Sequence, residues 1–382
     1  MPVSWGTIRA VKVLCVLGTR PDAIKMAPVV HALRHLPDRF DTRVCVTAQH
    51  RELLDPLVRF FDLRPDHDLN VMTPGQSLGE LSVALLRQLT PVIASQRPDV
   101  VVVQGDTTSS FCAALAAFHA GSAVAHVEAG LRTGRNDHPF PEEANRRLIS
   151  CVTRHHFAPT DLAREHLIGE GVPSEAITVT GKTAIDALHW TLPRAAAVSE
   201  DLLAPAGGHT ILVTLHRRES FGPPLEAMCE ALLTLAKRAG GRAQFVCTVH
   251  PNPNVSAVLR HRLEGVPGIR LIAPLDYPDF VGLLARCHFV VTDSGGLQEE
   301  GPALGKPVLV LRDHTERPEG VAAGAAQLVG RSPEAIVAAV MRLLDEPATY
   351  ERMSRSGSPY GDGHAASRIV DALARRMKPL PR

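Results

Sequence analysis

Aromatic side chains and an excess charge of either sign are what this sequence most lacks. Only 4% of its 382 residues are Phe, Trp or Tyr, too few for the stacking platforms on which proteins bind single-stranded nucleic acid. The formal net charge is +1 at pH 7, so electrostatic attraction does not favour nucleic acid or an anionic membrane as a partner. With 45% hydrophobic and 21% charged residues, the composition is typical of a soluble globular protein.

Cysteine pairs and long apolar runs are also missing. The seven cysteines are dispersed and none stands in a C-x-x-C pair, which predicts reduced thiols in a reducing compartment. No apolar run approaches the roughly 20 residues that a membrane span needs, and the first run, residues 11–17, is predicted to be a strand. We therefore expect a cytoplasmic protein. We expect no H-x-x-x-H or H-E-x-x-H spacing on a helix among the 18 histidines, which argues against a metal site.

The alternation of short apolar runs with amphipathic stretches predicts an α/β fold. This alternation is typical of parallel sheets that helices cover on both faces. The expected strands are residues 11–17, 43–47, 100–104, 123–127 and 156–158, then 210–214, 244–248, 270–272, 289–292 and 308–311. The expected helices are residues 24–35, 79–95, 109–119, 225–239, 254–263, 277–286, 298–303, 333–344 and 364–377.

The length of the chain and one Pro/Ala/Gly-rich segment, residues 188–208, predict two domains. The first Rossmann-like domain is expected at residues 1–187 and the second at 188–361. Ligands of such sheets bind outside the carboxyl ends of the strands, so two domains facing each other are expected to enclose a cleft. No G-x-G-x-x-G follows the first strand, which argues against a dinucleotide cofactor.

A glycine turn in the second half, DSGG at residues 293–296, is the most informative motif. It follows an apolar strand and precedes a predicted helix, so backbone N–H groups and the positive end of the helix would face a phosphate. Glycine removes the Cβ atoms that would block a close approach. Glu299 and Glu300 lie one turn into the helix, where they could accept hydrogen bonds from sugar hydroxyls. The alternative is an ordinary Gly-rich turn with solvated glutamates.

Cations and carboxylates follow the strands of the first half. Arg20 and Lys25 lie near the start of a helix, where a bound anion would offset their unfavourable position in the helix dipole. Asp106 and Glu128 follow two later strands, and Glu142 lies in the first turn of a helix. Carboxylates that share a site push one another's proton affinities apart, which separates acid from base roles. The alternatives are surface cations and helix-capping carboxylates.

The second half repeats this pattern with basic residues. His216 and Arg217 follow its first strand, and Arg317 follows a later one. We interpret them as groups that face an anionic ligand. The alternative is a hydrogen-bonded histidine beside solvated arginines.

Ten motifs occur in the order seen in the non-hydrolysing UDP-N-acetylglucosamine 2-epimerases, and the chain resembles that family from about residue 11 to 367. The motifs are GTRPDAIKMAP, TAQHRELLD, QGDTTSS, HVEAGLRTG, PFPEEANRR, GKTAIDAL, HRRESFG, TDSGGLQEE, GKPVLVLRD and TERPE. The resemblance implies the glycosyltransferase-B fold, with a C-terminal helix, residues 362–382, packing back on the first domain. It also implies a homodimer, a UDP-sugar substrate, and no need for a metal or a nicotinamide.

The reaction that the resemblance implies is reversible inversion at C2 of the sugar, which links UDP-N-acetylglucosamine to UDP-N-acetylmannosamine in polysaccharide biosynthesis. A base removes the C2 proton, UDP leaves C1, and a 2-acetamidoglucal remains bound until UDP adds back. By position, the family's essential residues correspond to Asp106, Glu128, Glu142 and His216. The residues expected to bind UDP or the sugar are Arg20, Lys25, Arg217, Ser294, Gly295, Gly296, Glu300 and Arg317, with Ser294, Gly295 and Gly296 cradling the diphosphate and Glu300 binding the ribose.

The chain departs from the family's pattern at three positions near these motifs. Lys182 stands where Asn is usual, Gln104 where His is common, and His314 where Thr is common. Alternative functions therefore stay open: a 2-epimerase for a modified UDP-sugar such as a 2,3-diacetamido uronate, a glycosyltransferase, or a UDP-sugar-binding regulator without activity.

A second UDP-N-acetylglucosamine site, which is allosteric in many bacterial members, is marked by Q-H-x-x-M-x-x-Q. The chain keeps Gln49 and His50, but Leu53 replaces Met and Pro56 replaces the second Gln. The sequence leaves open whether this site survives.

Overall fold

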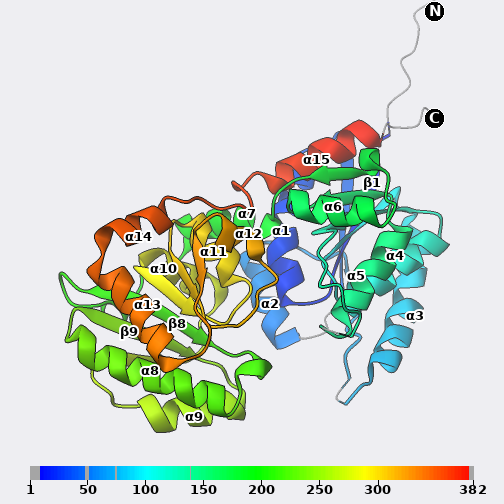
Figure 1. The fold of residues 1–382 in the computed structure, drawn as a ribbon. Coiled ribbons are helices and arrows are strands. Elements are labelled where there is room, and N and C mark those ends of the chain that lie inside the picture. Colours follow the sequence, from blue (N-terminus) through cyan, green and yellow to red (C-terminus); the bar gives the residue numbers. More distant parts are fainter. Residues whose placement is uncertain (1–8, 48–50, 74, 138, 378–382) are drawn as a thin grey trace, which may run out of the picture. The chain divides into compact units, whose positions relative to one another are not determined.

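The computed structural model describes residues 9–47, 51–73, 75–137 and 139–377 (Figure 1). The chain divides into two compact units, each with a parallel sheet of its own. Unit 1 comprises Met1–Ala187 and Gly361–Arg382, and unit 2 comprises Leu188–Tyr360. Within the described part of the chain, no helix is both long and apolar enough to cross a membrane.

The sheet of unit 1 has seven parallel strands. They are β1 (Val11–Leu17), β2 (Phe40–Val46), β3 (His67–Asp68), β4 (Val100–Gln104), β5 (Ala123–Val127), β6 (His155–Ala158) and β7 (Ile177–Val179). Their order across the sheet is β3-β2-β1-β4-β5-β6-β7. The central strand β4, VVVVQ, is buried at every position, because its β-branched side chains pack against helices on both faces.

Eight helices accompany this sheet within the described residues. They are α1 (Arg20–Arg34), α2 (Arg51–Phe60), α3 (Leu78–Gln96), α4 (Thr108–His119), α5 (Glu142–Val152), α6 (Asp161–Gly169), α7 (Thr183–Thr191), which runs on into unit 2, and α15 (Ala365–Arg376). One core cluster joins side chains of α3 and α4 to those of β1 and β4, including Leu85, Cys112, Leu14 and Val101. The apolar faces of the helices therefore cover the sheet, as the alternating pattern predicts.

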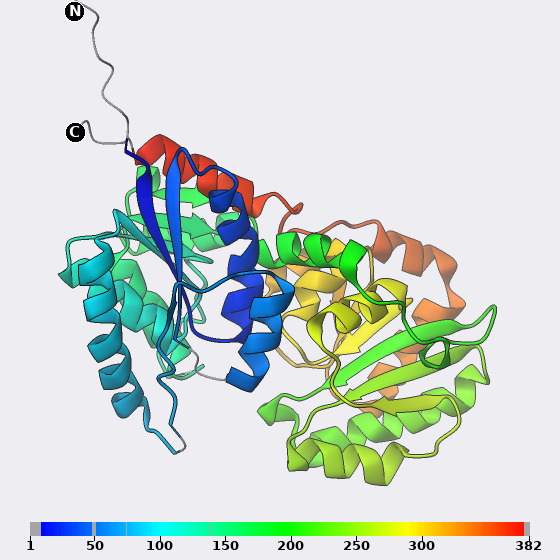
Figure 2. The same cartoon turned by 180° about the vertical axis from the view of Figure 1, so that it is seen from behind.

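Helix α15 joins unit 1 although residues 188–360 separate it from the rest of that unit. It packs against α1, and Figure 2 shows the two helices, red and dark blue, side by side. Asp186 of α7 fixes its first turn, because the carboxylate accepts the N–H groups of Ala365 at 3.1 Å and Ala366 at 2.7 Å. A carboxylate on these free N–H groups also offsets the positive end of the helix.

Unit 2 is built on a six-stranded parallel sheet. Its strands are β8 (His209–Leu215), β9 (Ala243–Val249), β10 (Ile269–Ile272), β11 (Phe289–Thr292), β12 (Val308–Val310) and β13 (Ala326–Leu328), in the order β10-β9-β8-β11-β12-β13. Its further helices are α8 (Pro223–Ala239), α9 (Pro253–Leu263), α10 (Tyr277–Arg286), α11 (Leu297–Ala303), α12 (Pro318–Ala322), α13 (Pro333–Asp345) and α14 (Pro347–Ser354). All but α11 carry Pro in the first two positions, where its missing N–H is not needed.

The predicted fold class, two Rossmann-like α/β domains, is confirmed. Four predicted strands, residues 11–17, 100–104, 123–127 and 289–292, have the bounds of β1, β4, β5 and β11. The sequence did not predict the short strands β3, β7 and β13, which have two or three residues each. So few residues give no periodic signal, and the neighbouring strand decides their conformation.

The expected hinge, residues 188–208, is more regular than its composition suggests. It opens with the end of α7 and contains two 3₁₀ turns, Leu192–Arg194 and Glu200–Leu202. The expected C-terminal helix is α15, and the last five residues assigned to it, 378–382, lie outside the described residues.

Candidate active site

Both sheets have a switch point, where the strand order changes direction. It lies between β1 and β4 in unit 1 and between β8 and β11 in unit 2. In open parallel sheets, ligands bind beyond the carboxyl ends of the strands at such a point. Most of the predicted site residues lie in the segments that follow these four strands, and one more lies directly after β5. They are Arg20, Lys25, Asp106, Glu128, His216, Arg217, Ser294, Gly295, Gly296 and Glu300.

Asp22, to which we assigned no role from the sequence, organises the switch point of unit 1. Its carboxylate accepts the N–H groups of Gly18 and Thr19, each at 3.0 Å, and the hydroxyl of Thr107 at 3.3 Å. These bonds tie the loop after β1 to the loop after β4. Burial raises the pKa of Asp22 to about 6, against the opposing effect of the two N–H groups and Lys25. Asp three residues after Thr19 is a capping-box pattern, a signal present in the sequence.

Lys25 and Glu128 form an ion pair at the same edge of the sheet. The distance from Lys25 Nζ to Glu128 Oε2 is 2.8 Å, and the glutamate side chain is 8% exposed. Glu128 also has a φ of +65°, a left-handed conformation that is strained for a residue with a Cβ. The left-handed backbone sets the direction in which the Glu128 side chain points from the end of β5.

Asp106 and Glu142 are linked through α5. Arg146 of α5 contacts Asp106 Oδ2 at 2.6 Å and the buried Glu143 at 2.9 Å. Glu142 is the first residue of the helix and is half-buried. Glu143 and Arg146 were not among the predicted site residues, although their spacing of three residues on a helix is a pattern for an ion pair.

In unit 2, a buried carboxylate joins the two loops at the switch point. Asp293, which is 0% exposed, accepts the N–H of His216 at 3.0 Å and that of Arg217 at 3.0 Å. His216 Nδ1 lies 3.6 Å from Asp293 Oδ1. Burial lowers the pKa of His216, and Asp293 acts in the opposite direction. The imidazole is therefore neutral at pH 7.

Two guanidinium groups converge on the glycine turn. A Cβ atom at Gly295 would lie 2.8 Å from Arg317 Nη1 and 3.1 Å from Arg217 Nη2, whereas a Cβ at Gly296 would meet nothing within 4 Å. Gly295 therefore lets both guanidinium groups lie against the turn, and a side chain there would push them away. Helix α11 has seven residues, so we expect the two arginines to supply more of the positive charge here than the helix dipole does.

The neighbouring carboxylates differ from what the sequence suggested. Glu299 is 2% exposed, and its Oε1 accepts a bond of 2.7 Å from Arg317 Nε. It therefore supports Arg317, and the expectation that it accepts sugar hydroxyls was wrong. Glu300 is half-buried on α11.

Glu316 supplies further negative charge to this cluster. It lies 3.4 Å from Arg217, 3.3 Å from Arg317 and 2.5 Å from Arg312. Burial alone would raise the pKa of Glu316, but the three arginines and a backbone N–H outweigh burial and lower it to about 2. An anionic ligand would share these cations with Glu316.

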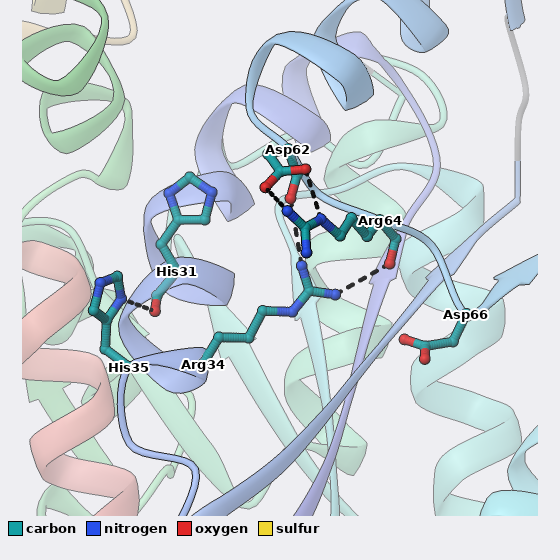
Figure 3. Close-up of a pocket in the computed structure, with 6 residues that line it drawn as sticks. All are labelled: His31, Arg34, His35, Asp62, Arg64 and Asp66. Atoms are coloured by element: carbon teal, nitrogen blue, oxygen red, sulfur yellow. Dashed lines mark hydrogen bonds and ion pairs between the residues drawn. The ribbon is translucent and has the colours of Figure 1, made fainter.

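A hollow of about 490 Å³ lies elsewhere in unit 1 (Figure 3). Its lining residues come from α1 and the segment after α2, and they are His31, Arg34, His35, Asp62, Arg64 and Asp66. Arg64 forms an ion pair with Asp62 at 2.6 Å, and Arg34 donates to the carbonyl oxygen of Arg64 at 3.1 Å. No predicted site residue lines the hollow. Its charged side chains already have partners, since Asp66 pairs with Arg43 at 2.9 Å and Arg34 also donates to the carbonyl oxygen of Leu63 at 2.7 Å.

Two histidines that line this hollow bear on the prediction that the chain has no metal site. His31 of α1 and His35, the C-cap residue of that helix, stand four residues apart, so the prediction that the chain has no H-x-x-x-H at a helix was wrong. His31 Nε2 lies 2.6 Å from the carbonyl oxygen of Phe61, and His35 Nδ1 lies 2.7 Å from that of His31. Within the described residues, no group of three or more His, Cys, Asp or Glu side chains could hold a metal ion.

The positions that depart from the family's pattern have different environments. Lys182 is 3% exposed and precedes α7, and Gln104, the last residue of β4, is 1% exposed. His314 is exposed. Gln49 and His50 of the allosteric motif lie outside the described residues, and Pro56 lies within α2.

Comparisons with known proteins show the family to which the chain belongs. A family model described as UDP-N-acetylglucosamine 2-epimerase matches residues 31–374. The UDP-N-acetylglucosamine 2-epimerase of Salmonella typhimurium is 50% identical over 371 residues, which cover 95% of this chain and 98% of that protein.

Solved structures extend the likeness to the fold. The UDP-GlcNAc 2-epimerase from Neisseria meningitidis, solved bound to UDP-GlcNAc, has a TM-score of 0.87 and 43% identity over 96% of this chain and 100% of that one. A glycosyltransferase from Streptomyces nogalater has a TM-score of 0.58 and 18% identity over 96% of this chain and 100% of that one. This second likeness concerns the fold alone, which is the glycosyltransferase-B fold.

Proposed function

The chain belongs to the UDP-N-acetylglucosamine 2-epimerase family, and from this premise we propose that it interconverts UDP-N-acetylglucosamine and UDP-N-acetylmannosamine by inverting C2. The observation that carries the proposal is the gathering of carboxylates at one edge of the unit 1 sheet. Asp106 follows β4, Glu128 follows the neighbouring strand β5, and Glu142 begins α5.

We assign the proton transfers at C2 to these carboxylates. One of Asp106, Glu128 and Glu142 removes the C2 proton, and another returns a proton to the opposite face, which inverts the centre. Between the two transfers the C1–O bond to UDP breaks and a C1–C2 double bond forms, giving a 2-acetamidoglucal and free UDP. The re-addition of UDP at C1 with protonation at C2 completes the exchange, so no external oxidant, reductant or metal enters the balance.

We assign stabilisation of the departing UDP to unit 2. Arg217 and Arg317, beside the turn of Ser294 to Gly296, would stabilise the negative charge that grows on the diphosphate as the C1–O bond breaks. Glu300 would accept hydroxyl groups of the ribose. Neutral His216 would donate or accept a hydrogen bond near the same charge, and Arg20 and Lys25 would contact the ligand from unit 1.

The direct test is NMR of the purified protein with UDP-N-acetylglucosamine in deuterated water. We expect UDP-N-acetylmannosamine to form and both epimers to carry deuterium at C2, because the removed proton exchanges with solvent. A product that keeps its C2 proton would exclude elimination. Turnover only of a 2,3-diacetamido uronate would identify the modified-sugar epimerase, and irreversible release of UDP to an acceptor would identify a glycosyltransferase.

Replacing Glu128 with Gln tests the role of the carboxylate. We expect Glu128→Gln to abolish turnover, because the amide cannot take up a proton, and to leave the affinity for UDP within several-fold. The measurements are turnover by NMR and UDP binding by calorimetry, with Glu165→Gln on the exposed face of α6 as the matched control. Loss of UDP binding or of the folded state in Glu128→Gln alone would make the residue structural.

We further propose a homodimer, which the family resemblance implies, and a cytoplasmic location, in keeping with the dispersed, unpaired cysteines. Light scattering of the purified protein should give the mass of two chains, and the mass of one chain would overturn the dimer.

A further inference from the structure

Arg146 of α5 connects Asp106 to a buried carboxylate. Its Nε and Nη2 both bond to Asp106 Oδ2, at 2.8 Å and 2.6 Å, and its Nη1 donates to Glu143 Oε2 at 2.9 Å. The side chain of Arg146 is 14% exposed and that of Glu143 is 0% exposed. Because Glu143 holds one nitrogen and Asp106 receives the other two, the planar guanidinium has a single orientation.

The main chain of Asp106 is held by the same helix. Asn145 Nδ2 donates to the carbonyl oxygen of Asp106 at 2.8 Å. Two consecutive residues of α5 therefore fix Asp106 twice, through its backbone and through its carboxylate. Glu142 stands four residues before Arg146, so both side chains leave the same face of the helix. Helix α5 thereby sets the position of Asp106 relative to Glu142.

The contacts of Asp106 distinguish its two carboxylate oxygens. Both bonds from Arg146 end on Oδ2, and among the residues that the structure describes, none bonds to Oδ1. The Asp106 side chain is 24% exposed, so it is open to a ligand. Oδ1 is therefore the oxygen available for exchanging a proton.

We propose that Arg146 is a positioning residue for the epimerisation: by holding Oδ2, it presents Oδ1 of Asp106 to the C2 proton of the sugar. This role rests on the proposed function and on Asp106 being one of the proton-transferring carboxylates. A proton-transfer group must lie within hydrogen-bond reach and in line with the bond that it breaks or forms. Arg146 contacts neither the sugar nor UDP in this role; it acts through Asp106.

The test compares two neighbouring arginines. Arg147 Nε lies 3.7 Å from Oε1 of the same Glu143, but its side chain is 43% exposed and, within the described residues, it makes no bond to Asp106. We expect Arg146→Met to lower kcat by about 100-fold, the effect of a misplacement of roughly 1 Å, with KM nearly unchanged because no ligand contact is lost. Arg147→Met should keep kcat and KM near the values of the unaltered protein. Circular dichroism and thermal unfolding of both variants report the folded state.

A conservative variant separates positioning from a merely structural role. Arg146→Lys keeps the positive charge but lacks the guanidinium group that bonds to both carboxylates. We therefore expect a kcat between those of Arg146→Met and the unaltered protein. Added guanidinium chloride, at concentrations that leave the fold intact, should raise kcat of Arg146→Met, and ammonium chloride should not. If Arg146→Met fails to fold, the kcat of Arg146→Lys tests the positioning role of Arg146. A kcat equal to that of the unaltered protein would overturn that role.

Other outcomes overturn the proposal in distinct ways. Equal losses in Arg146→Met and Arg147→Met, or a folded Arg146→Met with unchanged kcat, would remove Arg146 from the mechanism while leaving the epimerase function standing. No turnover by the unaltered protein would instead refute the proposed function, and the positioning role with it.

Discussion

Glu128 shows how one residue combines strain with a site position. Its φ of +65° places the backbone in the left-handed region, which costs roughly 1–2 kcal/mol for a residue with a Cβ. Its carboxylate is held by Lys25 at 2.8 Å. Strained residues that persist at the end of a strand are often tied to function, which agrees with the role proposed for Glu128.

Comparing Ala and Gly at this position measures the strain. We expect Glu128→Gly to have a free energy of unfolding about 1 kcal/mol higher than Glu128→Ala, because both lose the carboxylate but only Gly relieves the left-handed conformation. Urea unfolding gives both values. At Glu165, exposed on α6, the order should reverse, because Ala is the better helix former by about 1 kcal/mol. A more stable Glu128→Ala would show that this backbone is not strained.

From the sequence, a site residue could be predicted only where its place directly after a distinct apolar run indicated the end of a strand. Asp106 and Glu128 could be placed at strand ends because the apolar runs before them are distinct. Asp293 stood inside the glycine motif, yet its contact with the N–H of His216, 77 residues away, depends on β8 and β11 being neighbours. Contacts across the sheet have no trace in local spacing, so the support that Asp293 gives could not be predicted, whereas the spacings of Asp22 and Arg146 carried a signal that we did not use.

At the scale of elements, Gly130 lets the segment after β5 pass close to α6. A Cβ at Gly130 would lie 2.2 Å from the carbonyl oxygen of Ala163, and the φ of Gly130 is +89°. His166 Nδ1 of α6 lies 3.0 Å from the carbonyl oxygen of Gly130. The helix therefore packs against backbone here, which leaves no space for a side chain.

Two glycine substitutions separate the clash from the backbone strain. Gly121 also has a positive φ, +75°, but a Cβ there would meet nothing within 4 Å. We expect Gly121→Ala to lower the free energy of unfolding by about 1 kcal/mol, and Gly130→Ala by about 3 kcal/mol or more because overpacking adds to the strain. Chemical denaturation measures both. Equal losses would show that α6 can move away without cost.

The sequence predicted elements well where an apolar run was long enough to be periodic. Residues 11–17 and 123–127 became β1 and β5 with the same bounds. By contrast α7, which continues to Thr191, extends into the segment expected to be a hinge. The Pro, Ala and Gly content of residues 188–208 suggested a loop. Burial of the side chains on α7 stabilises the helix at the start of this segment despite that composition.

At the scale of the whole molecule, unit 1 buries several histidines that its proposed chemistry does not use. His126 on β5 pairs in register with His156 on β6, and His155 precedes it. Burial lowers the pKa of His126 and His155 to about 4 and that of His156 to about 3. Each is neutral when folded but takes up a proton when unfolded below pH 6.5. Stability from these residues is therefore complete above pH 6.5 and is lost as the pH falls towards 4.

Acid should consequently loosen β5 and β6 of unit 1 early, because three of these histidines lie on these two neighbouring strands. Each histidine lowers the free energy of unfolding by about 1.4 kcal/mol per pH unit in this range. Asp22, with its pKa raised to about 6, acts in the opposite sense between its unfolded pKa and pH 6 and offsets one of the three. In unit 1 burial also raises the pKa of Asp186, which acts like Asp22, and lowers that of His31, which acts like the other histidines. In unit 2 burial lowers the pKa of His216 and, to about 4, that of His288. We expect hydrogen exchange, followed by mass spectrometry from pH 7 to 5, to speed up more in peptides of β5 and β6 than in those of β8.

A single substitution checks the assignment. His156→Leu removes one titrating group and should make the exchange of β5 and β6 less dependent on pH, while peptides of β8 keep their behaviour. If β8 opens first in acid, or if the variant keeps the full pH dependence, the buried histidines of unit 1 do not set its acid stability.

The return of α15 to unit 1 has a consequence for how a ribosome delivers this protein. Residues 188–360 are contiguous, so the nascent chain can complete unit 2 as soon as they have emerged. Unit 1 starts first but must wait for Ile369, Val370 and Leu373, which are at most 2% exposed in the finished structure. At translation rates of roughly 5–20 residues per second, the surface of α1 that α15 covers stays bare for roughly 10–40 s after Ala187 has been made. During that interval we expect the N-terminal part of the polypeptide to be the client that chaperones bind and proteases cut.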